Sequence, residues 1–261
     1  MPARTQYAPG TPSWIDIQTS DPAGAKPFYR ALFGWDYDDL PVGHDAEGNP
    51  AFYSMATKNG QNVAAIAPLP MPGIPPHWNT YVTVADVDKS AAEVPNAGGT
   101  VAMPPFDVMD AGRMAVIADP TGALVCIWQA TNNIGASLVN EHGTLAWNEL
   151  MTPDVPAATA FYSKIFGWIA EPIQMPGMDY TELKLNGRGI GGAMGLPMPG
   201  MPPAWAVYFA VDDCDKAAEI VAANGGSVMQ PPMDIPPGRM AVIADPAGAI
   251  FNVIKLTQPG D

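Results

Sequence analysis

The sequence predicts an α+β protein made of four βαβββ modules, which form two tandem domains. The first observation behind this prediction is a repeat: PSWIDIQTSDPAGAKPFYRALFGW at 12–35 matches LAWNELMTPDVPAATAFYSKIFGW at 145–168. The second is GRMAVIADP, which occurs at 112–120 and again, unchanged, at 238–246. Copies of roughly domain size indicate a duplication. We predict a first domain at 11–130, a linker at 131–143 and a second domain at 144–257.

The elements of one copy follow from its pattern. SWIDIQ alternates between apolar and polar residues, which predicts a half-buried strand with Trp14 and Asp16 on the face opposite Ile15. Asp21 is a suitable N-cap for the helix that follows, and Gly34 is suited to end it. Further strands are expected at 51–57, 62–67, 78–84, 100–104, 113–118 and 123–129, and a second helix at 86–99.

A Pro-Met loop recurs between the modules, as LPMPGIPPHW at 69–78 and LPMPGMPPAW at 196–205. It precedes the point where each copy restarts with a strand and a helix. We therefore interpret each loop as the connector between the two modules of one domain.

Composition excludes several classes of protein. Twelve Lys and Arg against twenty-six Asp and Glu give a formal net charge of −14, which repels nucleic acids and anionic membranes. No apolar run reaches the roughly 18 residues of a membrane-spanning helix, and no signal peptide is visible, so we expect a cytoplasmic protein. The two cysteines suit reduced, buried thiols. We expect neither nucleic acid nor a membrane as a partner.

Three motif pairs resemble the vicinal oxygen chelate superfamily, which includes glyoxalases, bleomycin resistance proteins and extradiol dioxygenases, and the tandem arrangement resembles two-domain glyoxalase-like proteins of actinobacteria. The pairs are D-(x)6-FY-(x)3-FGW at 21–35 and 154–168, DP-(A/T)-GA at 119–123 and 245–249, and the VADVD and VDDCD turns. The resemblance covers residues 11–257. It implies that each pair of modules curls into an open, eight-stranded cup that holds the ligand.

The resemblance also implies where metal ligands would stand on the cup wall. These positions fall on Trp14, Asn79 and Cys126 in one copy, on Trp147, Ala206 and Asn252 in the other, and within apolar residues 63–67 and 191–194 for the fourth ligand. Trp and Ala donate nothing to a metal. We therefore predict no metal, no cofactor, and no metal-dependent glyoxalase or dioxygenase activity. A displaced metal site at Asp16 or Glu149 stays open as an alternative.

Strand alternation places aromatic and polar side chains together on the cup side. They are Trp14, Asp16, Asn79, Tyr81, Cys126 and Trp128 in the first domain, and Trp147, Glu149, Tyr208 and Asn252 in the second. Such a lining is typical of a small-molecule pocket. Asp16 and Glu149 are the candidate catalytic residues, because a desolvated carboxyl can act as a general acid or base. Alternatively they bind a cationic ligand, or form a structural hydrogen bond or an ion pair with Arg113 or Arg239.

Arg113 and Arg239 are further ligand-binding candidates, because an arginine near the cup mouth can clamp a carboxylate. Their identical surroundings in the two copies fit a shared packing role as well. Cys126 is a nucleophile only if a neighbour lowers its pKa. No His or Lys lies beside it in the sequence, and a buried filler is the alternative.

The sequence favours a metal-independent protein that binds a small organic molecule. One alternative is an enzyme (lyase, isomerase or hydrolase-like) that acts on a small oxygenated metabolite by acid–base chemistry through Asp16 or Glu149. Another is a non-catalytic scaffold or interaction protein. A cup filled with its own side chains favours the scaffold, and an open cup favours the other two. The expected state is a monomer or a homodimer.

Overall fold

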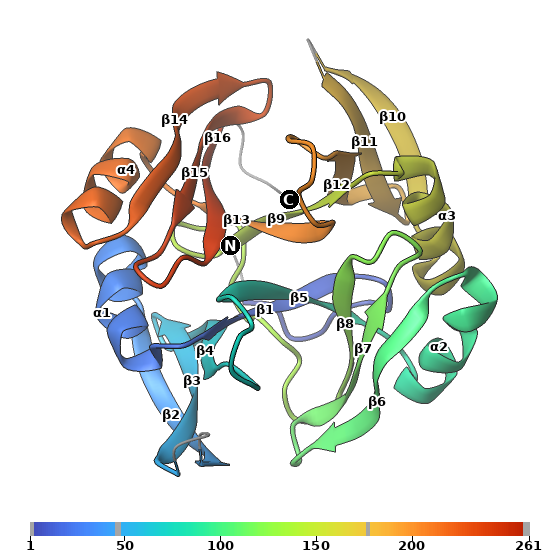
Figure 1. Ribbon diagram of the computed structural model, residues 1–261, viewed down its shortest axis with the longest axis horizontal. Coiled ribbons are helices and arrows are strands. Elements are labelled where there is room, and N and C mark those ends of the chain that lie inside the picture. Colours follow the sequence, from blue (N-terminus) through green and yellow to red (C-terminus); the bar gives the residue numbers. More distant parts are fainter. Residues whose placement is uncertain (1–2, 45–47, 176–177, 258–261) are drawn as a thin grey trace.

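A computed structural model describes residues 3–44, 48–175 and 178–257. It contains two eight-stranded mixed sheets, one from each repeat, with helices on the two outer flanks (Figure 1). The predicted α+β class and the four βαβββ modules are therefore confirmed. Within the described residues, no helix is long and apolar enough to cross a membrane.

The first sheet has the strand order β2-β3-β4-β1-β5-β8-β7-β6. Its strands are β1 (Pro12–Thr19), β2 (Asp36–His44), β3 (Pro50–Lys58), β4 (Gln61–Pro68), β5 (His77–Thr83), β6 (Thr100–Val108), β7 (Gly112–Ala118) and β8 (Leu124–Ala130). Its helices are α1 (Pro22–Phe33), α2 (Val87–Glu93) and the short 3-10 helix η1 (Pro95–Ala97).

The second sheet repeats this order as β10-β11-β12-β9-β13-β16-β15-β14. Its strands are β9 (Leu145–Thr152), β10 (Ile169–Met175), β11 (Met178–Leu185), β12 (Arg188–Gly195), β13 (Ala204–Ala210), β14 (Ser227–Ile235), β15 (Gly238–Ala244) and β16 (Ile250–Leu256). Its helices are α3 (Val155–Phe166) and α4 (Cys214–Ala223).

Local sequence sets the ends of α1 as expected. The Asp21 carboxylate accepts a hydrogen bond of 2.8 Å from the backbone N–H of Gly24, which satisfies one free donor of the first turn. Gly34 ends the helix in the left-handed conformation, with φ 73°. Asp154 and Gly167 do the same for α3, so the repeated motif has one structural meaning in both copies.

The strands that open the two modules of a domain lie side by side at the centre of its sheet. In the first sheet β1 pairs with β5 in antiparallel register, with Asp16 opposite Asn79. In the second, β9 pairs with β13, with Glu149 opposite Ala206. Both candidate carboxylates therefore stand at the middle of a sheet, where neighbouring strands surround them.

The two domains share their cores through the repeated aromatic motifs. The helix face of β1 and helix α1 pack with β13, β15, β16 and α4 of the other domain in one buried cluster, and α1 lies beside α4 in Figure 1. Tyr29 donates a hydrogen bond of 3.0 Å to the Asp245 carboxylate across this interface. The indole N–H of Trp35 donates to the Gly143 carbonyl at 2.7 Å, and that of Trp168 to the Gly10 carbonyl at 2.6 Å. The FY, FGW and DP motifs thus hold the domains together.

Candidate functional site

The concave face of the first sheet carries a buried carboxylate with three hydrogen-bond donors. Asp16 is only 1% exposed. It accepts hydrogen bonds from the Tyr81 hydroxyl at 2.7 Å, the Asn79 amide at 2.9 Å and the Tyr53 hydroxyl at 3.0 Å. The indole N–H of Trp14 donates in turn to the Tyr53 hydroxyl at 2.9 Å. Four of these side chains were expected on the cup side, and Tyr53 was not.

The electrostatics of Asp16 follow from these contacts. Burial raises its pKa above the ordinary aspartate value, while the bonds from Asn79, Tyr81 and Tyr53 act against that rise. Of the alternatives for Asp16, the ion pair with Arg113 does not form, because Arg113 binds Asp88 and Asp107, and hydroxyl and amide groups stabilise the carboxyl instead. A carboxyl that keeps its proton to higher pH is suited to act as a hydrogen-bond donor or a general acid.

The second cup repeats the arrangement with fewer donors. Glu149 is 7% exposed and accepts a hydrogen bond of 2.8 Å from the Tyr208 hydroxyl. Burial raises its pKa, and bonds from Tyr208 and Tyr180 oppose the rise. Trp147 donates to the Tyr180 hydroxyl at 2.9 Å, as Trp14 does to Tyr53. Ala206 takes the place of Asn79, so one donor is missing.

A glycine makes room for this second network. A Cβ atom added at Gly192 would lie 1.9 Å from the Tyr180 hydroxyl oxygen. Ala65 holds the corresponding place beside Asp16 in the first cup. Only a glycine therefore allows Tyr180 to approach the sheet this closely. Tyr180 also borders a crevice of about 510 Å³ between the N-terminus of α3 and the β10–β11 hairpin.

Residues 133–137, which lie in the predicted linker, cross the first cup. The Ala136 N–H donates to the Ser13 carbonyl at 2.8 Å, and the Ser137 N–H to the Asn62 carbonyl at 2.7 Å. Trp128 donates its indole N–H to the Asn133 carbonyl at 2.8 Å. Ala136 is fully buried in the cluster that contains Trp14, Tyr81, Cys126 and Trp128. The linker thus contributes to the packed lining of the first cup.

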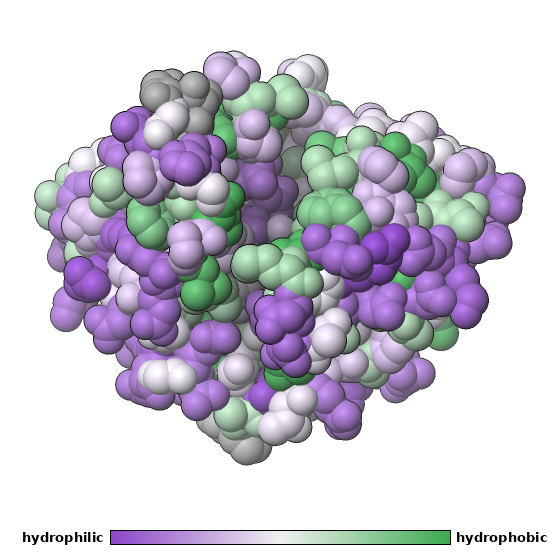
Figure 2. All heavy atoms as spheres, turned by 90° about the horizontal axis from the view of Figure 1, so that it is seen from below, coloured by the Kyte–Doolittle hydropathy of each residue, from purple (hydrophilic) through white to green (hydrophobic). Residues whose placement is uncertain are grey.

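A hollow nevertheless remains on this face of the molecule. Figure 2 shows it between two lobes, with hydrophobic side chains on both sides and hydrophilic ones at depth. The outermost strands of the first sheet carry exposed apolar residues, Leu40 and Val42 on β2 and Met103 and Phe106 on β6. Apolar rims around a polar floor are typical of a site for a small organic molecule.

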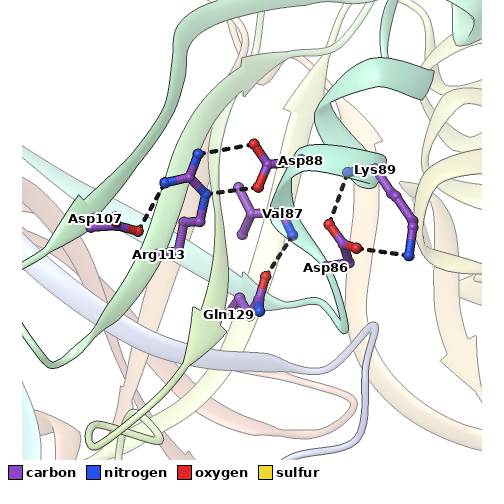
Figure 3. A network of polar contacts seen from close by, with 7 residues as sticks. All are labelled: Asp86, Val87, Asp88, Lys89, Asp107, Arg113 and Gln129. Carbon is purple, nitrogen blue, oxygen red and sulfur yellow. Dashed lines mark hydrogen bonds and ion pairs between the residues drawn. The ribbon is translucent and has the colours of Figure 1, made fainter.

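Arg113 and Arg239 lie outside the cups. Arg113 stands opposite Gln129, on the sheet face that alternates with Met114 and Trp128. Its guanidinium binds Asp88 at 2.7 and 2.9 Å and Asp107 at 2.8 Å (Figure 3). Arg239 repeats the pattern with Asp215 and Asp234. Both arginines connect a strand hairpin to a helix, on the sheet face opposite the cup lining.

The remaining candidates, Cys126 and Asn252, differ in their surroundings. Cys126 is 4% exposed, and burial raises the pKa of its thiol, the opposite of what a nucleophile needs. It packs in the apolar cluster beside Trp128 and is left out of the proposed site. Its counterpart Asn252 stands opposite Tyr208 on the second cup face and is 5% exposed.

The side chains at the implied metal positions do not fit a divalent cation. In the first cup Asp16 is already bonded to three donor groups, which satisfy a carboxylate without a cation. Trp14 offers no lone pair, and its N–H is used by Tyr53. Within the described part of the chain, no three His, Cys, Asp or Glu side chains gather in a way that could hold a metal ion.

Comparisons with known proteins agree with this architecture. The sequence model of the Glyoxalase/Bleomycin resistance protein/Dioxygenase superfamily matches residues 11–127 and 144–253. "Putative glyoxylase CFP32" of Mycobacterium tuberculosis (strain CDC 1551 / Oshkosh) is 53% identical over 260 residues, with 98% of both chains covered. "Anthracycline biosynthesis protein DnrV" of Streptomyces peucetius is 35% identical over 269 residues, with 97% of this chain and 96% of the relative covered.

Solved structures show the same fold at low identity. The Mn(II)-bound glyoxalase from Novosphingobium aromaticivorans superposes with a TM-score of 0.67 at 16% identity, covering 97% of this chain and 84% of its own. The 2,3-dioxygenase LapB from Pseudomonas sp. KL28 superposes with a TM-score of 0.64 at 16% identity, covering 100% of this chain and 95% of its own. At such identity these structures support the fold alone.

Proposed function

This chain belongs to the glyoxalase/bleomycin resistance protein/dioxygenase superfamily, and from that premise we propose that it binds a small organic molecule in its cups without a metal ion. One observation carries the proposal. Each cup has at its floor a buried carboxyl, Asp16 or Glu149, that is held by tyrosine hydroxyls. A carboxyl kept in place by the protein's own donors is available to orient a ligand and needs no cation to remain buried.

The walls of the cups favour a flat, oxygen-bearing aromatic ligand. Trp14 and Tyr81 line the first cup, and Trp147 and Tyr208 line the second. Indole and phenol rings offer flat apolar area with one polar group each, which suits stacking against aromatic ligands. A relative that aligns over nearly the whole chain is named for anthracycline biosynthesis, which supports the same class of ligand.

The metal content of protein purified without chelators or a polyhistidine tag tests whether the cups bind their ligand without a metal ion. We expect less than about a tenth of an equivalent of any transition metal, unchanged after incubation with zinc, nickel, iron or manganese. Near one equivalent per chain, lost on either Asp16→Asn or Glu149→Gln, would show that the carboxylates act as metal ligands. A calorimetric screen of flat oxygenated aromatics then tests binding, and a complete absence of binding would contradict the proposal.

Acid–base catalysis is the second candidate function, favoured by the raised pKa of both floor carboxyls. A carboxyl protonated at higher pH than usual can give a proton to a carbonyl or alkoxide of a bound metabolite. Loss of turnover in Glu149→Gln with retained ligand binding would support this role. Equal turnover in the variant would exclude it.

The scaffold alternative has partial support from the buried lining of the first cup. The second cup is less filled, since Trp147 is only half-buried there, whereas Trp14 is 4% exposed. We therefore favour binding over a purely structural role. A reducing compartment such as the cytoplasm is part of the proposal, supported by the two free, buried cysteines.

A further inference from the structure

Asn252 has unused hydrogen-bonding capacity inside the second cup. It is 5% exposed, and its carboxamide forms no hydrogen bond within the described part of the chain. Its register on β16 places it beside Tyr208 of β13 and Val242 of β15, on the cup face. Among the described residues, the fully buried side-chain atoms without a partner are Trp78 Nε1 and Asp119 Oδ2, so the polar atoms of Asn252 keep contact with solvent. A carboxamide on the cup face that forms no hydrogen bond with the chain can bond to a ligand in the cup.

The first cup offers no equivalent. Cys126 stands at the matching position and belongs to an apolar cluster. The amide of Asn79 is bonded to Asp16, and the indole N–H groups of Trp14 and Trp128 are bonded to Tyr53 and to the linker. The polar groups of the first cup thus satisfy one another, whereas in the second Glu149 and Trp147 are bonded to tyrosine hydroxyls but Asn252 is not bonded.

The wall of the second cup is also less buried than that of the first. Ala206 replaces the larger Asn79 beside the floor carboxyl, and it is half-buried. Trp147 is half-buried, whereas its counterpart Trp14 is 4% exposed. No described segment crosses the second cup as residues 133–137 cross the first. The half-buried Trp147 is therefore the part of this wall that a ligand reaches first.

The chemistry of a carboxamide defines the group it would bind. It presents an N–H donor and a carbonyl acceptor side by side, and its complement is an acceptor beside a donor. A primary amide, or a carbonyl next to a hydroxyl, has that pattern. The floor carboxyl Glu149 and the formal charge of −14 both disfavour an anionic ligand.

We propose that Asn252 determines the ligand specificity of the second cup, where it recognises an uncharged aromatic molecule through a carbonyl and a neighbouring N–H or O–H group. The inference rests on the proposed function, because it assumes that the cups bind small organic molecules. It gives the two cups different roles. Asn252 forms hydrogen bonds with a polar group of the ligand, and its counterpart Cys126 forms none.

The test uses two uncharged probes of similar size and the full-length chain. Naphthamide carries the acceptor–donor pair, and methyl naphthoate keeps the carbonyl but lacks the donor. We expect calorimetry to show that the wild type binds the amide about tenfold more tightly than the ester. Asn252→Leu, which keeps the volume but removes both hydrogen bonds, should reduce this preference to less than about twofold. The smaller Asn252→Ala, which also removes both hydrogen bonds, serves the same purpose if the leucine variant does not fold.

Cys126→Ala is the matched control, and it should keep the full preference. A preference that survives both Asn252 variants, or one that disappears in Cys126→Ala, would overturn the inference. Equal binding of the two probes by the wild type would overturn it as well, while leaving small-molecule binding intact. If the wild type binds neither probe, this inference falls for aromatic carbonyl ligands. Failure of the broader aromatic screen would show that the proposed function had failed too.

Discussion

The two cups share one fold and one set of aromatic positions, but their polar side chains form different hydrogen bonds. In the first, Asp16 receives three hydrogen bonds and the linker covers part of the lining. In the second, Glu149 has lost one donor through Ala206, and Asn252 has no partner in the described residues. The two copies of one fold thus differ in how many hydrogen bonds their cup residues form with one another.

The largest difference should appear when the floor carboxyls are removed. Asp16→Leu leaves the Tyr81, Asn79 and Tyr53 donors buried without an acceptor, and we expect the free energy of unfolding to fall by about 3 kcal/mol. Glu149→Met affects fewer donors and should cost about half as much, roughly 1.5 kcal/mol. Urea denaturation of the two variants measures both values. Equal losses would break the distinction between the cups.

The contribution of the linker's contacts with the first cup to the free energy of unfolding can be measured at Gly135. Its φ is 102°, and an added Cβ would lie 2.3 Å from the Ser13 carbonyl oxygen. Gly135→Ala therefore combines backbone strain with a clash, and we expect a loss of about 3 kcal/mol. Gly248→Ala is the matched control, because its φ is 97° and no atom lies within 4 Å of the added Cβ. It should cost only about 1 kcal/mol, and a similar loss in the two variants would mean that the linker lies loosely.

Local sequence was sufficient for the repeat, the helix caps and the faces of β1. Asp21 and Gly34 act within a few residues of themselves, so their roles follow from residue type. Trp14 and Asp16 lie on the expected face, because alternation along a strand needs no knowledge of its neighbours. What depends only on the chain's near neighbours was therefore predictable.

Long-range register was not predictable in the same way. Tyr53 reaches Asp16 from a strand 37 residues away, and no local pattern marks that tyrosine as its partner. The path of the linker into the first cup depends on the gap between β1 and β4, which only the assembled sheet defines. The face of Arg113 was equally open, because it is fixed by the pairing of β7 with β8. The predicted domain boundaries and the ligand roles of the cup residues stay predictions.

A third comparison uses pH. The unfolded chain ionises Asp16 near pH 4, whereas burial keeps it protonated to higher pH in the folded state. The folded state then binds more protons in that interval, so the free energy of unfolding falls as pH rises from about 4 to the folded pKa and is level above it. Asp16→Asn should lack this slope. His77, which faces Asp16 and lowers its pKa, is present in both proteins.

Stability difference curves between wild type and Asp16→Asn, recorded by urea denaturation from acid to neutral pH, show this contribution directly. Glu149→Gln should remove a slope of the same sign, because burial raises the pKa of Glu149 too. A difference curve that rises with pH would mean that Asp16 is held ionised by its donors, in contradiction to the raised pKa.

The smallest effect is expected at the arginines, and it separates the cups from the opposite face of the sheets. Arg113 and Arg239 bind carboxylates that are more than half exposed, such as Asp88 at 59% and Asp215 at 59%. Ion pairs of this kind are screened by water and salt, and they lie across the sheet from the cup lining. Arg113→Gln and Arg239→Gln should therefore leave the affinity for naphthamide unchanged within about twofold. A tenfold loss of naphthamide affinity in Arg239→Gln would mean that this guanidinium contacts the ligand. The ligand site would then not be confined to the cup face of β15.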